Sequence, residues 1–223
     1  MSFSVTYKAY GSNSILVSWE DTINEAISED IYRFNHEINK QNSTNIIETV
    51  SCYTSLTVFY LSSINSCEII TWLKDIYKNH KEPIKILSKT WKIPVCYHRD
   101  YALDLSNLAQ VKNITNEEVI HLHTKQIYTV DFIGFLPGFS YLSGLNKLLY
   151  TPRLGQPRTH VAKGSIAIGG RQTGIYPCSS PGGWHIIGRT HFELFNPNNS
   201  PPCLIKPFDK IQFIAISKQE FES

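Results

Sequence analysis

Alternating and helix-spaced apolar residues organise the first eighty positions of the chain. Residues 3–7 alternate between apolar and polar, and residues 15–19 form a second apolar run beyond a Gly-Ser-Asn turn. This pattern predicts two short strands. Thr22 and Glu25 then form a sequence capping box, so we expect a helix to begin there. Its buried face is predicted by apolar residues at spacings of four and three. They are Ile23, Ile27, Ile31, Phe34 and Ile38.

The same order of elements then repeats. Residues 45–50 and 56–61 are predicted strands, and Asn65 with Glu68 marks the start of a second helix. Its apolar face consists of Ile69, Leu73 and Ile76. Two ββα units predict a small α+β domain over residues 1–83. The polar segment that ends in Pro83 is the expected domain boundary.

Short strands dominate the rest of the chain. Residues 91–97 predict a strand in which Pro94 marks an edge or a bulge. Two short helices follow, at 103–111 and 116–123, and Thr115 with Glu118 caps the second. Many strands joined by Gly/Pro turns predict a closed or nearly closed barrel over residues 84–223. The strands are expected at 127–135, 165–168, 174–176, 184–188, 193–195, 203–205 and 210–216.

Charge and glycine are concentrated in one part of this predicted barrel. Residues 134–190 hold eleven of the twelve glycines and four of the six arginines. Residues 132–192 contain no Asp or Glu and carry a formal charge of +6, so the remainder carries −4 to give the net +2. A glycine-turned, acid-free, Arg-rich segment suits a carboxylate or phosphate ligand. The alternative is that the glycines only turn corners and the arginines lie on a solvated face.

Common catalytic motifs do not account for this segment. Residues 169–174 (GGRQTG) lack the lysine of a P-loop, there is no GxSxG sequence, and paired carboxylates are absent from the segment. Any acid or base within it must come from Tyr141, His160, His185 or Tyr176. For His185, the alternative is a buried histidine with a structural role.

Metal, membrane and nucleic-acid functions are not expected. His121 and His123 are two apart and would face away from each other on a helix, so no metal site is predicted. The five cysteines include no CxxC pair, which favours a reducing compartment. The N-terminus lacks an apolar signal core and no apolar run could span a bilayer. With a net charge near zero, we expect a cytoplasmic protein without a nucleic-acid or membrane partner.

Several motifs in order resemble the family of the 5-oxoprolinase B subunit, also called allophanate hydrolase subunit 1 or KipI-type kinase inhibitor. They are Gly134-Phe135-Leu136-Pro137-Gly138-Phe139, Thr151-Pro152-Arg153, Pro157-Arg158, Gly170 with Gln172-Thr173-Gly174-Ile175-Tyr176-Pro177, Ser180-Pro181-Gly182-Gly183-Trp184, and Ile187-Gly188-Arg189-Thr190. The resemblance extends to residue 209 and, more weakly, into the N-terminal half. One departure is the loop at residues 98–105, where the family tends to be rich in glycine.

The resemblance implies an α+β N-terminal domain followed by a cyclophilin-like β-barrel. It also implies one component of an ATP-dependent complex that opens 5-oxoproline to glutamate, together with a cyclophilin-like C subunit and a separate A subunit. Such a chain is expected to be inactive alone, and no motif here would ligate a metal that accompanies ATP. Since some relatives inhibit a sensor histidine kinase, a regulatory role is the alternative function.

Residue roles follow from combining the resemblance with the chemistry of the segment. Arginine forks suit carboxylate or phosphate, and glycines allow close backbone approach. We expect proton transfer and amide recognition from His185, Tyr176 and Gln172. Substrate or phosphate binding is expected from Arg153, Arg158, Arg189, Tyr141, Gly170 and Gly174. The arginines, Gln172, Tyr176 and His185 are predicted to converge on one cavity. A partner surface is expected at Leu136, Phe139, Tyr141 and Leu142, with burial in the core as its alternative.

Overall fold

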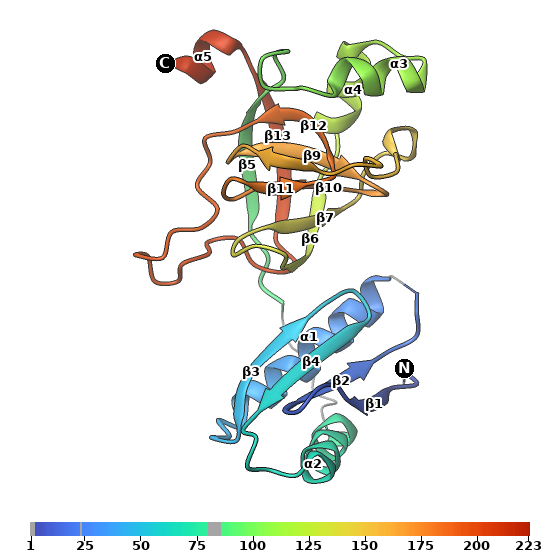
Figure 1. Ribbon diagram of the computed structural model, residues 1–223, viewed down its shortest axis with the longest axis vertical. Coiled ribbons are helices and arrows are strands. Elements are labelled where there is room, and N and C mark those ends of the chain that lie inside the picture. The colour runs from blue at the N-terminus through green and yellow to red at the C-terminus, as the bar shows by residue number, and fades with distance from the viewer. Residues whose placement is uncertain (1–2, 23, 80–85) are drawn as a thin grey trace. The chain divides into compact units, whose positions relative to one another are not determined.

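The computed structural model describes residues 3–22, 24–79 and 86–223, which fall into two compact units, Met1–Lys85 and Ile86–Ser223 (Figure 1). The expected boundary at Pro83 lies outside the described residues. In the first unit, four antiparallel strands pair in the order β1-β2-β4-β3. The elements follow the order ββα twice: β1 (Thr6–Ala9), β2 (Ser14–Ser18), α1 (Glu25–Lys40), β3 (Ile46–Ser51), β4 (Ser55–Tyr60) and α2 (Ser66–Asn79).

The core of the first unit lies between this sheet and the apolar faces of its two helices. The predicted stripe of α1 is buried at Ile27, Ile31, Phe34 and Ile38, whereas Ile23 lies outside the described residues. The predicted cap was wrong: α1 begins after Asn24, whose side chain accepts a hydrogen bond from the Ile27 backbone N–H at 2.9 Å. Asparagine is as good an N-cap as threonine, so the choice depends on where the stripe can face the sheet.

The second unit is built on a closed barrel of seven strands in the order β10-β7-β6-β13-β5-β12-β9. Only β13 and β5 pair in parallel; the other neighbours are antiparallel. Closure leaves no long exposed edge. The strands are β5 (Thr90–Cys96), β6 (Tyr128–Ile133), β7 (Ser140–Ser143), β9 (Ser165–Gly169), β10 (Gln172–Ile175), β12 (His185–Arg189) and β13 (Lys210–Ile216).

Further elements surround the barrel. A separate two-stranded ribbon pairs β8 (Arg158–Val161) with β11 (Ser180–Gly182). The helical elements are α3 (Leu105–Lys112), α4 (Asn116–Thr124), the short η1 (Lys147–Leu149) and the C-terminal α5 (Lys218–Glu222). The capping box that was predicted at Thr115 and Glu118 is present at the start of α4. Strands β7, β8 and β11 were not predicted, because each has four residues or fewer in a Gly/Pro-rich context.

Two predicted strands are wrong. Residues 193–195 and 203–205 form no strand, and only an isolated bridge joins Phe195 to Cys203. Three alternating residues carry too little pattern to distinguish a strand from a loop whose backbone pairs at a single point. Pro94 lies within β5, where it pairs with Ile214 of β13, and β5 meets β12 only at Cys96. β12, the second neighbour of β5, therefore pairs with β5 at one end only. Pro94, which has no N–H, interrupts no pairing with β12 at its own position.

The barrel interior is filled by apolar side chains and one buried polar network. His123 of α4 is fully buried, with its Nδ1 2.7 Å from the Tyr97 hydroxyl and its Nε2 3.0 Å from Thr173 Oγ1. Because Thr173 donates its own proton to the Ala167 carbonyl, His123 Nε2 is the donor and Nδ1 accepts from Tyr97. This neutral histidine is a structural member of the core, and burial lowers its pKa to about 3.

Candidate active site

Strands of the barrel wall present one set of side chains inward and a different set outward. Leu142 of β7 and Ile168 of β9 belong to the barrel core. Their strand neighbours Tyr141 and Ala167 belong to a second cluster, on the opposite face of the same wall. This outer cluster is largely aromatic and consists of Phe139, Val161, Ala167, Tyr176, Trp184 and Ile186, with Leu136 and Tyr141 packed against it. The candidate site is therefore on the outside of the wall, and the barrel interior is packed.

A cavity of about 280 Å³ opens among these aromatic rings, and we call it the aromatic cavity. Its walls come from the loop before β7, from Tyr141 of β7, from the segment before β8, from Tyr176 directly after β10, and from β11 with the residues that follow it. The lining residues are Phe135, Phe139, Tyr141, Arg153, Pro157, Tyr176, Pro181, Gly182, Gly183 and Trp184. The mixture of aromatic walls and few polar groups is typical of small-molecule sites.

Edge-to-face ring contacts hold the aromatic walls in place. The Phe139 ring centroid lies 5.2 Å from that of Tyr176 and 5.6 Å from that of Trp184, both at near right angles. Tyr141 stacks on Phe132 at 4.3 Å and meets Trp184 edge-on at 5.7 Å. Pairs with these separations add to area burial and fix ring orientation. The cavity is thus pre-formed rather than dependent on a ligand to order it.

Two glycines make room for these rings. A Cβ on Gly182 would lie 2.3 Å from the Tyr176 hydroxyl, and a Cβ on Gly169 would lie 2.6 Å from the Trp184 ring. Any side chain at either position would displace an aromatic wall of the cavity. At these two positions glycine is required by the close approach of the backbone to aromatic rings.

Sequence reasoning did not assign a site role to Phe135, which is 61% exposed and lines the aromatic cavity. Its φ is +67°, and the Leu136 N–H donates to the Gly134 carbonyl at 2.8 Å. These features define a γ-turn of the rare form with a positive φ at its centre, which is strained for a residue with a side chain. Strained, exposed aromatic residues beside a cavity are typical of functional loops. The flanking glycines and Pro137 were the available signal.

Arg153 supplies the guanidinium group that lines the aromatic cavity. Its guanidinium carbon lies 5.8 Å from the centroid of the Trp184 ring, within the range of a cation–π contact. Arg153 is exposed, so its charge can meet a ligand that enters from solvent. The carboxylate or phosphate role predicted for Arg153 is compatible with this position at the cavity wall.

Tyr176 is the predicted proton-transfer residue that lines the same cavity. It is 1% exposed, and burial raises the pKa of its phenol, an effect that a backbone hydrogen bond from Trp184 and the charges of Arg153 and Arg158 oppose. A raised pKa keeps the phenol neutral near pH 7. Tyr176 can therefore donate a hydrogen bond to a ligand oxygen, but it does not supply a phenolate base.

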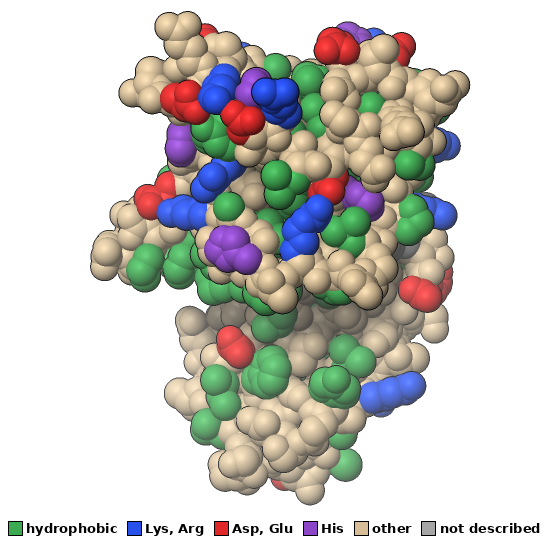
Figure 2. Space-filling model, turned by 45° about the horizontal axis from the view of Figure 1, so that its top comes forward, with side chains coloured by type: hydrophobic (Ala, Val, Ile, Leu, Met, Phe, Trp, Pro, Cys, Tyr) green, Lys and Arg blue, Asp and Glu red, His purple; other side chains and the backbone are tan. Residues whose placement is uncertain are grey.

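The other two predicted arginines line a second, smaller cavity of about 130 Å³, which we call the arginine cavity. The structure thus divides the set predicted to converge on one cavity. Figure 2 shows basic and histidine side chains gathered, with a few acidic ones, on one face of the barrel unit. The lining residues of the arginine cavity are Asp100, Tyr101, Leu103, Arg158, His160, Val161, Ala162, Ser165, Ile186 and Arg189.

His185 and Gln172 line neither cavity. His185 Nε2 lies 2.9 Å from the Pro152 carbonyl, so it is the donor, and Nδ1 is buried without a hydrogen-bond partner. Gln172 begins β10, opposite Gly169. The alternative of a structural histidine suits the position of His185 better than proton transfer in the aromatic cavity.

Both glycines predicted to approach a ligand have structural contacts. Gly170 exchanges backbone hydrogen bonds with Thr151, donating at 2.7 Å and accepting at 3.0 Å, which engages its N–H. A Cβ on Gly174 would lie 3.0 Å from the Phe139 ring, so this glycine supports an aromatic wall. Of the expected partner surface, Phe139 and Leu142 are buried, at 1% and 0% exposed, and their alternative role in the core holds.

Among the residues described, no three His, Cys, Asp or Glu side chains gather in a way that could hold a metal ion. His121 and His123 lie on α4, and His123 is committed to the barrel core. The helices of the described part of the chain include none long and apolar enough to cross a membrane.

Comparison with known proteins identifies the family. Residues 5–205 match the carboxyltransferase domain, subdomain C and D. The chain is 33% identical over 224 residues to the 5-oxoprolinase B subunit of Bacillus subtilis, covering 96% of this chain and 93% of the relative. It is 41% identical over 175 residues to the Haemophilus influenzae protein of the same name, covering 78% and 82%. The chain belongs to the family of 5-oxoprolinase B subunits.

Solved structures extend this family likeness to the fold. The protein TTHA0988 is matched with a TM-score of 0.78 and 26% identity over 91% of this chain and 40% of that one. Urea amidolyase of K. lactis is matched with a TM-score of 0.84, at 23% identity, over 99% of this chain and 15% of that one. At that identity the second likeness concerns the fold alone. This family member thus has the fold of a segment found within much longer proteins.

Proposed function

We propose that this chain is the B subunit of an ATP-dependent complex that opens 5-oxoproline to glutamate. The observation that carries the proposal is the aromatic cavity with Arg153 beside Trp184. 5-Oxoproline is a small flat lactam with one carboxylate. Aromatic walls suit its ring, and the guanidinium suits its carboxylate. The names of the relatives from B. subtilis and H. influenzae support the choice of this substrate.

Tyr176 provides a second contact for the substrate in this proposal. As a neutral phenol it donates a hydrogen bond to the lactam oxygen, which carries the partial negative charge of the amide. The same oxygen is the atom that would receive a phosphoryl group. Activation of a stable amide by phosphorylation creates a leaving group before water attacks. The chain's own residues would bind and orient the lactam during that step.

In this proposal, ATP binds to a partner chain. The aromatic and arginine cavities, of about 280 and 130 Å³, are smaller than the roughly 300–1,000 Å³ of sites for drug-sized ligands. A more open hollow of about 450 Å³ on α2 is lined by Glu68 and Asp75 and by no Arg or Lys, so it does not suit phosphate groups. The sequence also lacks a P-loop. We therefore propose that the A and C subunits complete the active complex, and that the isolated chain has no 5-oxoprolinase activity.

The test is substitution of Arg153 in the reconstituted complex. Arg153→Gln should lower kcat/KM for 5-oxoproline by about 30- to 1,000-fold, because it removes a charge-assisted contact worth roughly 2–4 kcal/mol. Arg171→Gln is the matched control: Arg171 is exposed and lies 6.0 Å from the Tyr150 ring, outside both cavities. Equal rates for the two variants, at unchanged melting temperatures, would remove Arg153 from the site.

The alternative function is regulation of a sensor histidine kinase by docking. Docking needs no small-molecule cavity, so Arg153→Gln would leave kinase inhibition intact. Steady release of glutamate by the isolated wild-type chain would contradict the proposed division of labour within the complex.

A further inference from the structure

The arginine cavity is distinct from the aromatic cavity in its lining and in its chemistry. Its walls come from β8, from the ends of β9 and β12, and from the loop at residues 100–103. Two arginines and an exposed histidine line it, and no residue is shared with the aromatic cavity. The proposed lactam site leaves this second cavity without a role.

Arg158 is held in place but incompletely satisfied. Its Nη2 donates to Asp104 Oδ1 at 2.6 Å, and Asp104 Oδ2 accepts the Ile186 backbone N–H at 2.6 Å. Asp104 thus anchors the guanidinium to β12. The other terminal nitrogen of Arg158, Nη1, is buried and has no hydrogen-bond partner. A buried donor without an acceptor is costly, and Arg158 is a lining residue of the arginine cavity.

Arg189 supplies the second positive charge. Its Nε donates to the Lys163 carbonyl at 2.9 Å, which fixes the inner end of the guanidinium. A guanidinium has five N–H donors in a rigid fork, and this bond uses one of them. With Nε fixed, the terminal nitrogens are held in a limited range of positions at the cavity wall. A fixed fork is well suited to a tetrahedral oxyanion.

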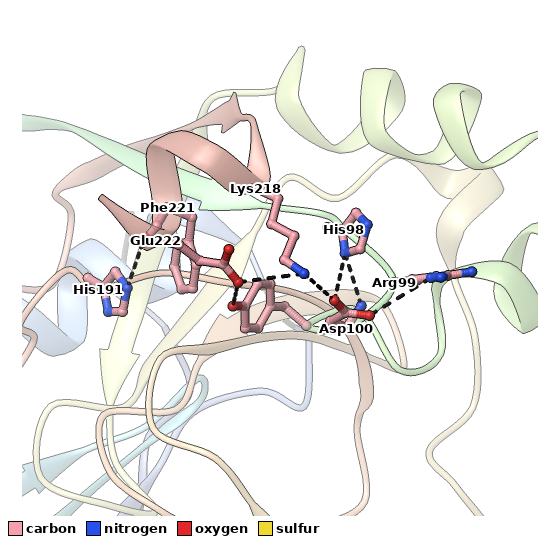
Figure 3. Close-up of polar contacts among 8 residues, drawn as sticks. His98, Arg99, Asp100, His191, Lys218, Phe221 and Glu222 are labelled. Atoms are coloured by element: carbon pink, nitrogen blue, oxygen red, sulfur yellow. Dashed lines mark hydrogen bonds and ion pairs between the residues drawn. The ribbon is translucent and has the colours of Figure 1, made fainter.

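Asp100 is the single carboxylate that lines the arginine cavity, and Lys218, Arg99 and the His98 ring already contact it (Figure 3). Lys218 of α5 lies 2.6 Å from its Oδ2, His98 Nδ1 lies 3.3 Å from the same oxygen, and Arg99 Nε lies 3.9 Å from Oδ1. The hydrogen bond from Lys218 is the largest cause of the lowered pKa of Asp100. Asp100 is therefore charged and paired, and it does not leave an uncompensated negative charge at the cavity.

The C-terminal helix also fixes the rim of the arginine cavity at the neighbouring residue. Tyr101 donates its hydroxyl proton to Glu222 at 2.7 Å, and its ring lies 4.6 Å from that of Phe221. Phe221 in turn stacks on His191 at 4.0 Å (Figure 3). The loop that departs from the glycine-rich family pattern is thus held by side chains of α5, which gives the cavity a defined wall.

We propose that the arginine cavity is a binding site for one tetrahedral oxyanion, inorganic phosphate, held by Arg158 and Arg189. About 130 Å³ is several times the roughly 30 Å³ that a water molecule occupies in the liquid, so a single phosphate fits. The choice of phosphate rests on the proposed ATP-dependent function, because hydrolysis of ATP releases it. The oxyanion site itself rests on the two guanidinium groups and on the unpaired Arg158 Nη1.

The experiment measures binding of inorganic phosphate to the isolated full chain by titration calorimetry, at constant ionic strength in chloride. Wild type should bind phosphate, and Arg189→Gln should weaken the affinity at least tenfold. The matched control Arg171→Gln loses the same charge outside the cavity and should bind as wild type does. No heat of binding in wild type, or equal affinities in both variants, would overturn the proposal.

Two further arms separate this site from the proposed lactam site and from nucleotide. Arg158→Lys keeps a cation opposite Asp104 but loses the fork, so it should weaken phosphate binding while melting near the wild-type temperature. Arg153→Gln should leave phosphate binding unchanged, even if it abolishes turnover in the complex. Loss of phosphate binding in Arg153→Gln, or Arg189-dependent binding of ATP without binding of phosphate, would overturn the assignment.

Discussion

The two faces of the barrel wall are built from the same strands but differ in what fills them. On the inside, Leu142, Ile168 and Phe213 are 0% exposed, and the Phe213 ring stacks on the neutral, fully buried His123 at 4.6 Å. On the outside, aromatic rings pack against the backbone of glycines and leave a cavity of about 280 Å³. Close packing serves stability, and the unfilled outer face provides the proposed site.

A β-bulge in β6 contributes to the difference between the inner and outer faces of the wall. Val130 pairs with Leu142 and Phe132 pairs with Tyr141, so Asp131 is the extra residue between them. Without the extra residue, Phe132 would point the same way as Val130, into the barrel. The bulge turns Phe132 outward, where it stacks on Tyr141 at 4.3 Å. Bulges often re-aim side chains beside functional sites.

The largest expected effect comes from substituting neighbours on β7 that face opposite ways. Leu142→Ala should reduce the free energy of unfolding by about 2–5 kcal/mol, because it opens a cavity in the packed interior. Tyr141→Phe keeps the ring contacts of the outer face and should change it by less than about 1 kcal/mol. Urea unfolding of both variants provides the measurement. Similar losses in the two would show that the faces do not differ in packing.

Sequence periodicity predicted the parts that depend on local contacts. The α1 stripe and the strands at residues 165–168 and 210–216 were placed within one or two residues, because neighbours three, four or two apart decide them. The cap at Asn24 was missed in favour of Thr22, since both residue types cap well. Strands β8 and β11 were missed because their pairing joins residues about twenty apart with no apolar alternation.

The candidate site shows where local reasoning ends. Residue types indicated anion chemistry, but their grouping depends on contacts distant in sequence. Asp104 draws Arg158 into the arginine cavity from 54 residues away, and nothing near Arg158 in sequence announces that ion pair. Phe135 was overlooked because exposed aromatic residues in loops are ordinary in sequence. The flanking glycines and Pro137 indicate a turn, but the positive φ of Phe135 is seen only in the structure.

The second expected effect concerns acid and the barrel interior. Burial lowers the pKa of His123 to about 3, below its unfolded value of 6.5. The unfolded chain therefore takes up the proton first as pH falls, so stability is lost between pH 6.5 and 3, at about 1.4 kcal/mol for each pH unit. Near pH 5 the loss should be roughly 2 kcal/mol.

Urea unfolding at pH 7.5, 6 and 5 measures this acid slope. His123→Leu should start less stable at pH 7.5, because Tyr97 and Thr173 lose their partner, but its slope should be shallower than that of wild type. His160→Gln, at an exposed histidine, should keep the wild-type slope. A His123→Leu slope as steep as that of wild type would mean that the buried imidazole is not the acid-sensitive group.

The smallest expected effect concerns Asp131 in the β-bulge. Its pH dependence of stability has the opposite sign to that of His123. Burial raises the pKa of Asp131 to about 6, an effect that the hydrogen bond from Ser143 at 2.7 Å and the charge of Lys210 only partly offset. Its other oxygen, Oδ2, is buried without a partner. The folded chain binds this proton more tightly than the unfolded chain does. The contribution of Asp131 to stability is thus present at low pH and is lost as pH rises from about 4 to 6.

Asp131→Asn tests this directly, since the amide oxygen can still accept from Ser143 and the side chain carries no charge to bury. At pH 8 the variant should be more stable than wild type by about 1–2 kcal/mol, below the limit of roughly 3 kcal/mol that a shift of two pH units allows, because the site is partly solvated. The gain should shrink toward pH 4, where the wild-type carboxyl is protonated. Asp75→Asn, at an exposed carboxylate on α2, should show no such trend. A gain for Asp131→Asn that is constant between pH 4 and pH 8 would assign the effect to packing and leave the bulge carboxylate as well solvated as any surface acid.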